Sequence, residues 1–522
     1  MSAITNLVAE LLIRAVAGVI ELALRGWPDG RPQSHGSSRW AGWRDRRYLG
    51  RLSSPARAAG DGIALGFLGR DLLQSPAEDN VLVLGVQRSG KTSTVVVPTL
   101  LSWSGAVIAT STKEELVRLT APHRTSLGPV SVFAPLDRDT AWIEHIGLQS
   151  ATWNPIGAIS DCGSAAELAD HFTAEGKRSG AAHWYLSAAT LLTALAVLAK
   201  ERGGDMGTVL ATLNRTAQSE YVDLSKMLED ARAAELLLAH AMTPDREAGS
   251  VASTARACLG LWVDERVRRA TAPSKGELDL DHFLAQPSTL YLVAPAEEAE
   301  RCRPLFSALI ATLLRKATSR ARSQDGVLTP RLLLALDEAA NFARIPRLAG
   351  YASSGPGQGI QLLLCFHDLA QIESAYGREE MRTVWNNCRA RLLLPGQGDL
   401  ATLEHFSRAI GDETRTYQVR HGNAHSSSSS EQRTGRPLSS PDDLRRRQDA
   451  VLVYASAPPV RLQLRRWDQV PHFRRLACRC IRLFEERELE SRIPLDLIYL
   501  SWYIFACPRF LRACPAKNRC TG

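Results

Sequence analysis

Residues 81–92 read VLVLGVQRSGKT, and this stretch decides the fold. Its first four residues are apolar, which predicts a buried strand over Val81–Leu84. The next eight, Gly85–Thr92, match the pattern G-x-x-x-x-G-K-[ST] at every fixed position. A further apolar run, Val95–Leu101, predicts the helix that the pattern requires. Strand, loop and helix in this order are typical of a phosphate-binding loop, and a chance glycine turn before a helix is the weaker interpretation.

The chemistry expected of this loop follows from its backbone and two side chains. Glycines let the loop curl so that its N–H groups point inward at a helix N-terminus, where they bind anions. Lys91 can reach the β- and γ-phosphates of a nucleotide, and the Thr92 hydroxyl can ligate Mg²⁺. We therefore predict ATP and Mg²⁺ as cofactors. The residues predicted to hold the nucleotide are Gly85, Val86, Gln87, Arg88, Ser89, Gly90, Lys91, Thr92 and Ser93, with a solvent-facing position as an equal alternative for Arg88.

Length and composition are those of a globular protein with more than one domain. The 522 residues are enough for two or three domains, and 45% of them are hydrophobic and 23% charged. The net charge of +8 is compatible with an anionic partner but identifies none. Ten cysteines in this length do not form a disulfide-dense scaffold, so we expect reduced thiols.

Residues 1–60 are predicted to form an amphipathic helix and a basic linker. Residues 3–26 are apolar but carry two glutamates and two arginines, which leave no uninterrupted run of the roughly 20 residues that a bilayer requires. Their spacing suits a helix that lies on a membrane surface or packs on protein. Residues 28–60 mix arginines with Trp40 and other aromatic residues. Contact with anionic lipid or nucleic acid and a solvated linker are equally supported there.

Strand and helix patterns divide the rest of the chain. Residues 61–160 form the first part of a nucleotide-binding domain, with further strands predicted at Ala106–Ala109 and Val130–Phe133. Residues 161–284 show helical periodicity alone, which predicts an inserted all-α domain. The most apolar stretch of the chain, Trp184–Ala199, lies there. It is short and surrounded by soluble-looking helices, so we predict a buried helix and no membrane span.

Strands return in residues 285–475, the second part of the nucleotide-binding domain. Strands that alternate with helices predict a parallel sheet covered on both faces. Residues 422–440 contain five consecutive serines and are predicted to form a mobile loop. Residues 476–522 contain five cysteines and form a tail without an assigned role. The strands are predicted at Thr289–Ala294, Leu332–Leu336, Gln361–Phe366 and Ala390–Leu394, with Val451–Tyr454 and Val460–Leu464 as a closing hairpin or edge pair.

A second apolar strand carries the acids that nucleotide hydrolysis requires. Residues 331–338 read RLLLALDE, so two adjacent carboxylates follow the strand. We predict that Asp337 ligates Mg²⁺ together with Thr92 and that Glu338 polarises the attacking water. We also expect this strand and the one before the phosphate-binding loop to be neighbours in the sheet. Acid pairs after apolar runs are common, so this pattern is informative only in combination with the loop.

Longer stretches around these motifs resemble the VirD4/TraG coupling proteins, the ATPases of type IV secretion and conjugation. The likeness rests on residues 333–348 (LLALDEAANFARIPRL), 359–361 (GIQ) and 368–377 (DLAQIESAYG) and covers about residues 61–470 in order. Supporting matches are Lys113–Leu116 (KEEL) with Thr120 and Arg124, the element Trp153–Pro155 (WNP), and the segment from Arg436-Pro-Leu438 to Arg465-Arg-Trp467.

The resemblance implies an α/β fold, a RecA-like P-loop NTPase with a parallel-rich central sheet that an all-α domain interrupts. It implies that the all-α domain contacts cargo, and that a homo-hexameric ring couples ATP hydrolysis to movement of its substrate toward a type IV secretion channel. The substrate would be single-stranded DNA, a relaxase–DNA complex or a protein. Relatives usually carry two N-terminal transmembrane helices. We recognise none in this sequence, and expect contact with the membrane surface, peripheral or through partners, at the cytoplasmic side of the bacterial plasma membrane.

Two departures from the family bear on catalysis. Relatives commonly have an arginine in the turn before Gly359, where it is thought to reach the γ-phosphate of a neighbouring subunit, and this chain has Pro356. An arginine that a neighbouring subunit supplies to the γ-phosphate, an arginine finger, is worth a factor of ~10³ or more in rate. We therefore expect either slow hydrolysis or another arginine in this role. Relatives have a glutamine at the position of His367, which we predict to be catalytic with Lys91 and Glu338. A strand-end histidine without a catalytic role is an equal alternative. The arginines that remain as candidates are Arg344, Arg347, Arg389 and Arg391, and Gln371 is expected to be structural.

Three functions therefore compete. The first is a DNA-translocating motor ATPase, a coupling protein that moves DNA or a relaxase–DNA complex, and the helical insertion and the ending at Trp467 favour it. The second is an intracellular DNA pump of the FtsK/HerA type. The third is a nucleotide-gated scaffold with little turnover, which Pro356 and His367 keep open. The ATPase rate with and without single-stranded DNA distinguishes a motor from a scaffold.

Overall fold

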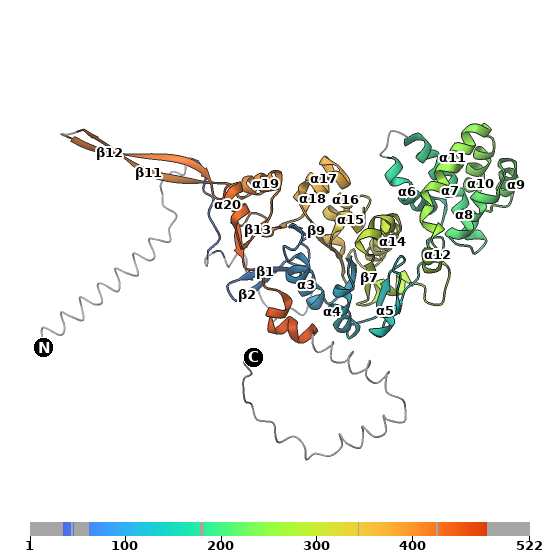
Figure 1. The fold of residues 1–522 in the computed structure, drawn as a ribbon, viewed down its shortest axis with the longest axis horizontal. Coiled ribbons are helices and arrows are strands. Elements are labelled where there is room, and N and C mark those ends of the chain that lie inside the picture. Colours follow the sequence, from blue (N-terminus) through green and yellow to red (C-terminus); the bar gives the residue numbers. More distant parts are fainter. Residues whose placement is uncertain are drawn as a thin grey trace, which may run out of the picture.

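A computed structural model describes residues 35–42, 45, 62–177, 182–342, 344–423 and 426–477 of the chain (Figure 1). The predictions made for the N-terminal helix, for most of the basic linker and for the tail beyond residue 477 lie outside these residues.

The described part of the chain is built on one large β-sheet. All neighbouring pairs from β10 to β6 are parallel, whereas β13 and β14 pair antiparallel at one edge. The predicted parallel-rich α/β sheet with its closing edge pair is thereby confirmed. The strands are β3 (Val81–Leu84), β4 (Ala106–Ser111), β5 (Val130–Phe133), β6 (Gln149–Ser150), β7 (Thr289–Val293), β8 (Leu332–Leu336), β9 (Ile360–Phe366), β10 (Ala390–Leu393), β13 (Ala450–Tyr454) and β14 (Val460–Leu462). Their order is β14-β13-β10-β3-β9-β8-β4-β7-β5-β6.

Helices cover both faces of this sheet, because its strands are apolar on both sides. In β3, Val81 and Val83 point to one hydrophobic core and Leu82 and Leu84 to the other, and all four are fully buried. On the valine side lie α3 (Val97–Ser102), α4 (Glu114–Thr125) and α5 (Ala141–His145). On the leucine side lie α14 (Ala296–Ser323), α15 (Ala339–Phe342), α16 (Leu348–Ser354), α17 (Leu369–Tyr376), α18 (Arg378–Asn387), α19 (Leu400–Ile410) and α20 (Pro441–Arg446).

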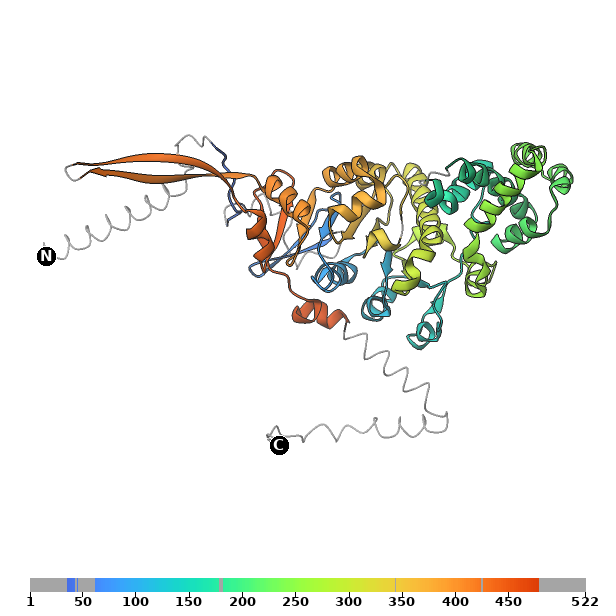
Figure 2. The ribbon, with the colours of Figure 1, turned by 45° about the horizontal axis from the view of Figure 1, so that its top comes forward.

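Between β6 and β7 the described residues contribute helices but no strand of the sheet. These helices interrupt the α/β fold as predicted and form one end of the molecule (Figure 2). Among the described residues α7 is the one helix long and apolar enough to cross a membrane by length and composition, yet most of it is buried against its neighbours. The helices are α6 (Cys162–Lys177), α7 (Ala182–Glu201), α8 (Met206–Arg215), α9 (Tyr221–Lys226), α10 (Ala231–Ala241), α11 (Asp245–Cys258), α12 (Glu265–Thr271) and α13 (Leu280–Ala285).

Two hairpins were not predicted. Strands β1 (Ala64–Leu68) and β2 (Asp71–Gln74) pair beside the helix that follows the phosphate-binding loop. Strands β11 (Asp412–Asn423) and β12 (Ser426–Pro437) form a long antiparallel ribbon that projects from the other end of the molecule (Figures 1 and 2). The prediction of a mobile loop over residues 422–440 is therefore wrong. Serine takes part in an antiparallel ladder through its backbone, and composition alone does not reveal the partner strand.

The described part of the basic linker packs against the sheet edge. The Ala41 N–H donates to the Pro459 carbonyl at 2.8 Å, and the ring centroid of Trp40 lies 4.6 Å from the Arg447 guanidinium. Trp40 is thus partly buried against residues of this chain, and the predicted alternatives, contact with lipid or nucleic acid and a solvated linker, both stay open.

Arg124 joins α4 to the sheet and is fully buried. Its Nε donates to the Thr289 hydroxyl at 2.8 Å, and its two Nη atoms donate to the carbonyls of Gly105, at 2.6 Å, and Trp103. Burial lowers the pKa of Arg124 to about 10, so the side chain is still charged at neutral pH. This residue supported the family resemblance, and its contacts give it a structural role.

We expect Arg124→Leu to lower the free energy of unfolding by about 3 kcal/mol or more, because each buried acceptor left without a donor costs about 1–3 kcal/mol. The matched control is Arg118→Leu on the same helix, where an arginine that is 45% exposed pairs with an exposed glutamate. The control should change the free energy by about 1 kcal/mol or less. Denaturant unfolding of both variants checks this, and equal losses would contradict the role assigned to Arg124.

Candidate functional site

The phosphate-binding loop leaves the carboxyl end of β3 and enters a π-helical turn, η3 (Thr92–Val96), that continues into α3. Gly90 has a φ of +95°, a conformation that side chains disfavour. A Cβ atom at Gly85 would lie 2.6 Å from the Ser89 hydroxyl and 2.9 Å from Leu394 Cβ. The two glycines of the motif are therefore required by backbone geometry at Gly90 and by close packing at Gly85.

Lys91 lies inside this loop and is only 6% exposed. Its ammonium group donates to the carbonyls of Gly85 at 2.5 Å and Val86 at 3.1 Å. A phosphate bound in the loop would offer charged oxygens in place of these neutral carbonyls, which makes stronger hydrogen bonds. Lys91 is thus held inside the loop, and its role toward a bound phosphate stays a prediction.

The expectation that the strands of the loop and of the acid pair are neighbours is wrong, because β9 lies between β3 and β8. The two motifs nevertheless meet. The Thr92 hydroxyl donates to Asp337 Oδ2 at 2.5 Å, across the end of β9. The intervening strand ends in Phe366, so the next residue, His367, follows directly between the two motifs.

Asp337 has the surroundings of a metal ligand. It is 8% exposed, its Oδ1 is buried without a hydrogen-bond partner in the described residues, and Thr110 donates to its backbone carbonyl at 2.9 Å. Burial raises the pKa of Asp337, and the hydrogen bond from Thr92 and the charge of Lys91 only partly oppose this. A buried carboxylate oxygen without a partner, next to a hydroxyl, fits a hard cation with oxygen ligands such as Mg²⁺.

Glu338 follows at a sharp bend of the backbone. Its φ of +57° lies in the left-handed region, and its carbonyl accepts the N–H of Asn341 at 2.9 Å as α15 begins. Residues held in this conformation cost free energy and occur preferentially at functional sites. The charge of Glu338 raises the pKa of both Asp337 and His367.

His367 is held through its backbone by two glutamines. Its N–H donates to Gln371 Oε1 and its carbonyl accepts from Gln397 Nε2, both at 2.8 Å. Burial and the charge of Lys91 lower the pKa of His367 against the opposing charge of Glu338. The neutral imidazole, which has one donor and one acceptor, is therefore favoured at neutral pH.

Gln397 is a site residue that the sequence analysis missed. It is 2% exposed, and its Oε1 accepts the N–H groups of Gly398 at 2.9 Å and Asp399 at 3.0 Å. These two bonds fix the orientation of the amide, so that its NH₂ group faces the His367 carbonyl. The signal in the sequence was a polar residue soon after the β10 strand, but only the strand order shows that β10 is adjacent to β3.

Of the four arginines proposed as fingers, two are held away from the loop of their own chain. Arg389 pairs with Asp79 at 3.2 Å, at the edge where β3 begins, and Arg391 donates to two backbone carbonyls of the preceding turn. Arg344 lies 3.9 Å from a glutamate of α6, and Arg347 is exposed. Pro356 comes just before β9, whereas Lys91 follows β3. Because these strands are parallel, Pro356 and Lys91 lie at opposite ends of the strands.

The fold and the loop define the chain as a RecA-like P-loop NTPase. Residues 50–476 match the family model described as "Type IV secretory system Conjugative DNA transfer", and the chain belongs to this family. It is 27% identical to the conjugal transfer protein TraG of Escherichia coli over 73% of this chain, and 25% identical to VirD4 of Agrobacterium fabrum over 85%. It spans 64% of the length of that TraG and 67% of that VirD4.

Two solved structures show the same fold. They are the bacterial conjugative coupling protein TrwBdeltaN70 and the plasmid coupling protein TrwB in complex with a non-hydrolysable ATP analogue, with TM-scores of 0.63 and 0.61. Each covers 84% of this chain, and the chain covers 95% and 96% of them, at 17% and 16% identity.

We expect Asp337→Asn to stabilise the protein without nucleotide and metal at neutral pH, by an amount on the order of 1 kcal/mol, since it removes a buried charge with an unpaired oxygen. Because the folded-state pKa of Asp337 is raised, the stability that its protonated form contributes is lost as the pH rises through that pKa. The advantage of the variant should therefore grow with pH over this range. Thermal melts in chelator at several pH values measure it.

The same substitution should weaken binding of a nucleotide in the presence of Mg²⁺, because one charged oxygen ligand is lost. A variant that is less stable than the native protein at neutral pH, or that binds the nucleotide with the native dependence on Mg²⁺, would contradict the role given to Asp337.

Proposed function

We propose that this protein is an ATP-driven coupling protein that recruits single-stranded DNA, a relaxase–DNA complex or a protein and moves it toward a type IV secretion channel. The observation that carries the proposal is the contact of Thr92 with Asp337 beside Lys91, in a chain of the conjugative DNA transfer family. We further propose that the chain acts as a homo-hexamer at the cytoplasmic side of the bacterial plasma membrane.

The site residues divide the work of hydrolysis among them. Lys91 and the loop N–H groups bind the β- and γ-phosphates, and Thr92 and Asp337 hold Mg²⁺. When bound, the metal neutralises charge that develops on the phosphate oxygens. Glu338 takes a proton from the attacking water, and the neutral imidazole of His367 donates a hydrogen bond to the γ-phosphate or holds the water.

Nucleotide complexes of a structural relative support these cofactors. TrwB has been solved with a non-hydrolysable ATP analogue and with ADP and Mg²⁺. The corresponding use of ATP and Mg²⁺ by this chain rests on its own loop and on the unpaired oxygen of Asp337.

A nucleotide-gated scaffold with little turnover is the second candidate function. It is favoured by Pro356 at the position of the expected finger and by the engagement of Arg389 and Arg391 within their own chain. An intracellular pump of the FtsK/HerA type would use the same site, and membership of the conjugative transfer family speaks against it.

We expect Glu338→Gln to reduce ATP hydrolysis by a factor of about 10² or more, because the base that activates water is lost, while ATP binding is retained. Single-stranded DNA should stimulate the native rate and leave the variant inactive. Rates of phosphate release with and without DNA, together with ATP affinity, test this. The matched control, Glu379→Gln, removes a charge from a side chain that is 86% exposed and should keep the native rate.

Absence of hydrolysis above background by the assembled native chain would favour the scaffold. Native hydrolysis that Glu338→Gln leaves unchanged would show that another residue is the base.

We expect Gln397→Glu to lower kcat by roughly 10- to 100-fold with little change in ATP affinity, since small misplacements of a catalytic group cost this much. The new carboxylate still accepts from the two backbone N–H groups. Its other oxygen, however, replaces the NH₂ group that donates to the His367 carbonyl, so two acceptors face each other there. Gln371→Glu adds the same charge and keeps its acceptor for the His367 N–H, so it should lose less activity. The pH profile of kcat should change with Gln397→Glu, and equal effects of the two variants would contradict the positioning role.

A further inference from the structure

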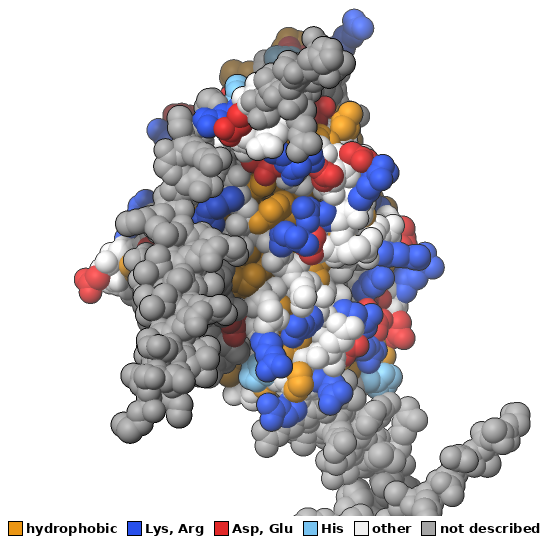
Figure 3. All heavy atoms as spheres, turned by 90° about the vertical axis from the view of Figure 1, so that its left-hand side faces the viewer, with side chains coloured by type: hydrophobic (Ala, Val, Ile, Leu, Met, Phe, Trp, Pro, Cys, Tyr) orange, Lys and Arg blue, Asp and Glu red, His pale blue; other side chains and the backbone are white. Residues whose placement is uncertain are grey.

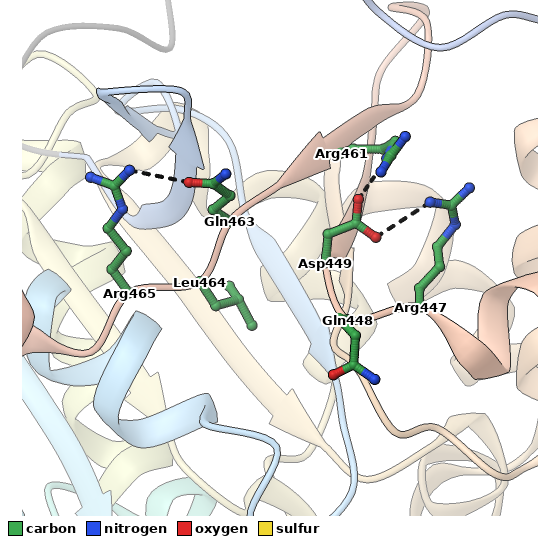
Figure 4. Close-up of a pocket in the computed structure, with 7 residues that line it drawn as sticks. All are labelled: Arg447, Gln448, Asp449, Arg461, Gln463, Leu464 and Arg465. Carbon is green, nitrogen blue, oxygen red and sulfur yellow. Dashed lines mark hydrogen bonds and ion pairs between the residues drawn. The ribbon is translucent and has the colours of Figure 1, made fainter.

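A pocket of about 610 Å³ lies apart from the candidate nucleotide site (Figure 4). Asp449 precedes β13, whose first residues pair with the last residues of β10. The pocket is therefore at the end of the sheet where the phosphate-binding loop follows β3. Across the sheet, however, β14 lies three strands, about 14 Å, from β3. No residue is shared with the candidate active site. The lining residues are Arg447, Gln448, Asp449, Arg461, Gln463, Leu464 and Arg465.

Positive charge and unused donors dominate this pocket. Three arginines and one carboxylate, that of Asp449, line the pocket, and Asp449 accepts from Arg447 at 3.3 Å and from Arg461 at 2.5 Å. The Nη atoms of Arg461 have no partner among the residues that the structure describes, and Arg447 Nε is buried without one. On the face of the molecule at the left-hand side of Figure 1, Lys and Arg side chains are spread among Asp and Glu side chains (Figure 3). An anion entering the pocket would therefore meet free charged donors.

Aromatic rings hold the arginines in place. The Trp40 centroid lies 4.6 Å from the guanidinium of Arg447 and 6.0 Å from that of Arg461. Arg465 stacks at 4.7 Å from the Phe67 ring and donates to the backbone of the β1–β2 turn. Side chains that are fixed before a ligand arrives lose less entropy on binding. The planar guanidinium fork matches the oxygens of a phosphate group, so the pocket is suited to a phosphate-bearing ligand.

The neighbouring chain segment indicates where this phosphate comes from. Residues 35–42 dock at the pocket through Trp40, and 34 residues precede them in the sequence. Residues 3–26 of that stretch are apolar with interspersed charges, a pattern suited to a membrane surface. Weak apolar anchors become stable on membranes when a basic site adds a second attachment.

We propose that the pocket of Arg447, Arg461 and Arg465 binds the phosphate of an anionic phospholipid headgroup. It thereby sets the sheet edge against the membrane at the point where the N-terminal segment joins the domain. This function is independent of nucleotide hydrolysis.

The test uses the full chain and vesicles of phosphatidylcholine with or without phosphatidylglycerol. Arg461→Gln with Arg465→Gln should weaken binding to the phosphatidylglycerol vesicles by about fivefold for each arginine removed, because each basic residue near an anionic surface contributes about that factor. The control, Arg382→Gln with Arg408→Gln, removes the same charge from helices α18 and α19, where the side chains are 54% and 81% exposed. It should bind the vesicles like the native chain.

A second pair, Arg461→Lys with Arg465→Lys, keeps the charge but loses the planar fork, and should bind more weakly than the native chain and more tightly than the glutamine pair. The proposal would be overturned if the lysine pair bound the vesicles as tightly as the native chain, or if the control pair lost as much affinity as the glutamine pair. Either result would show that general positive charge accounts for the binding. The proposal would also be overturned if inorganic phosphate bound the native chain, the glutamine pair lost this binding, and vesicle binding were unchanged. The pocket would then bind a soluble phosphate. Loss of affinity for single-stranded DNA, with vesicle binding unchanged, would likewise overturn it in favour of nucleic acid.

Discussion

The hydrogen bond from Thr92 to Asp337 is the interaction on which the site depends, because it joins two motifs that lie 245 residues apart in the sequence. Parallel strands bring both motifs to one edge of the sheet, but β9 separates them there. The loop after β3 must therefore reach across the end of that strand. His367 is the first residue after β9, so the strand order brings it to the end of the sheet where the two motifs meet, the place from which we propose that it acts.

The same edge holds groups that the folded protein stabilises poorly. Asp337 is desolvated with one oxygen unpaired, and Glu338 has a left-handed backbone conformation. Each feature costs free energy in the nucleotide-free protein. The stability of the surrounding strands offsets this free energy, since β8 is fully buried and pairs with a strand on each side. The rigid sheet thus keeps these groups in an unfavourable arrangement, which is the arrangement that the proposed binding of a cation and a phosphate would use.

The sequence predicts those parts of the fold that depend on local patterns. The bounds of β3, β5 and β8 follow from short apolar runs, and the loop and acid pair follow from spacing. Strand order could not be predicted in this way, because it depends on which apolar faces pack together. The predicted neighbour of β3 was therefore wrong, and Gln397 was not recognised as a residue close to the loop. The β11–β12 ribbon was missed for a related reason. Its stability rests on cross-strand backbone pairing, which a serine run such as residues 426–430 does not reveal.

Arg303, a buried cation, links α6, one of the helices between β6 and β7, to the turn that follows β8. Arg303 on α14 is 8% exposed, donates to Glu175 of α6 at 2.6 Å and to the backbone carbonyl of Asn341 at 3.4 Å. Asn341 is three residues after Glu338, and its own N–H is bonded to the Glu338 carbonyl. A displacement of α6 relative to the sheet would therefore stretch a charged contact whose other end bonds the turn that carries Glu338, the proposed base. The Arg303 side chain is buried whereas Glu175 is 49% exposed, so this contact is a point at which a change in the helical part can reach the turn after β8.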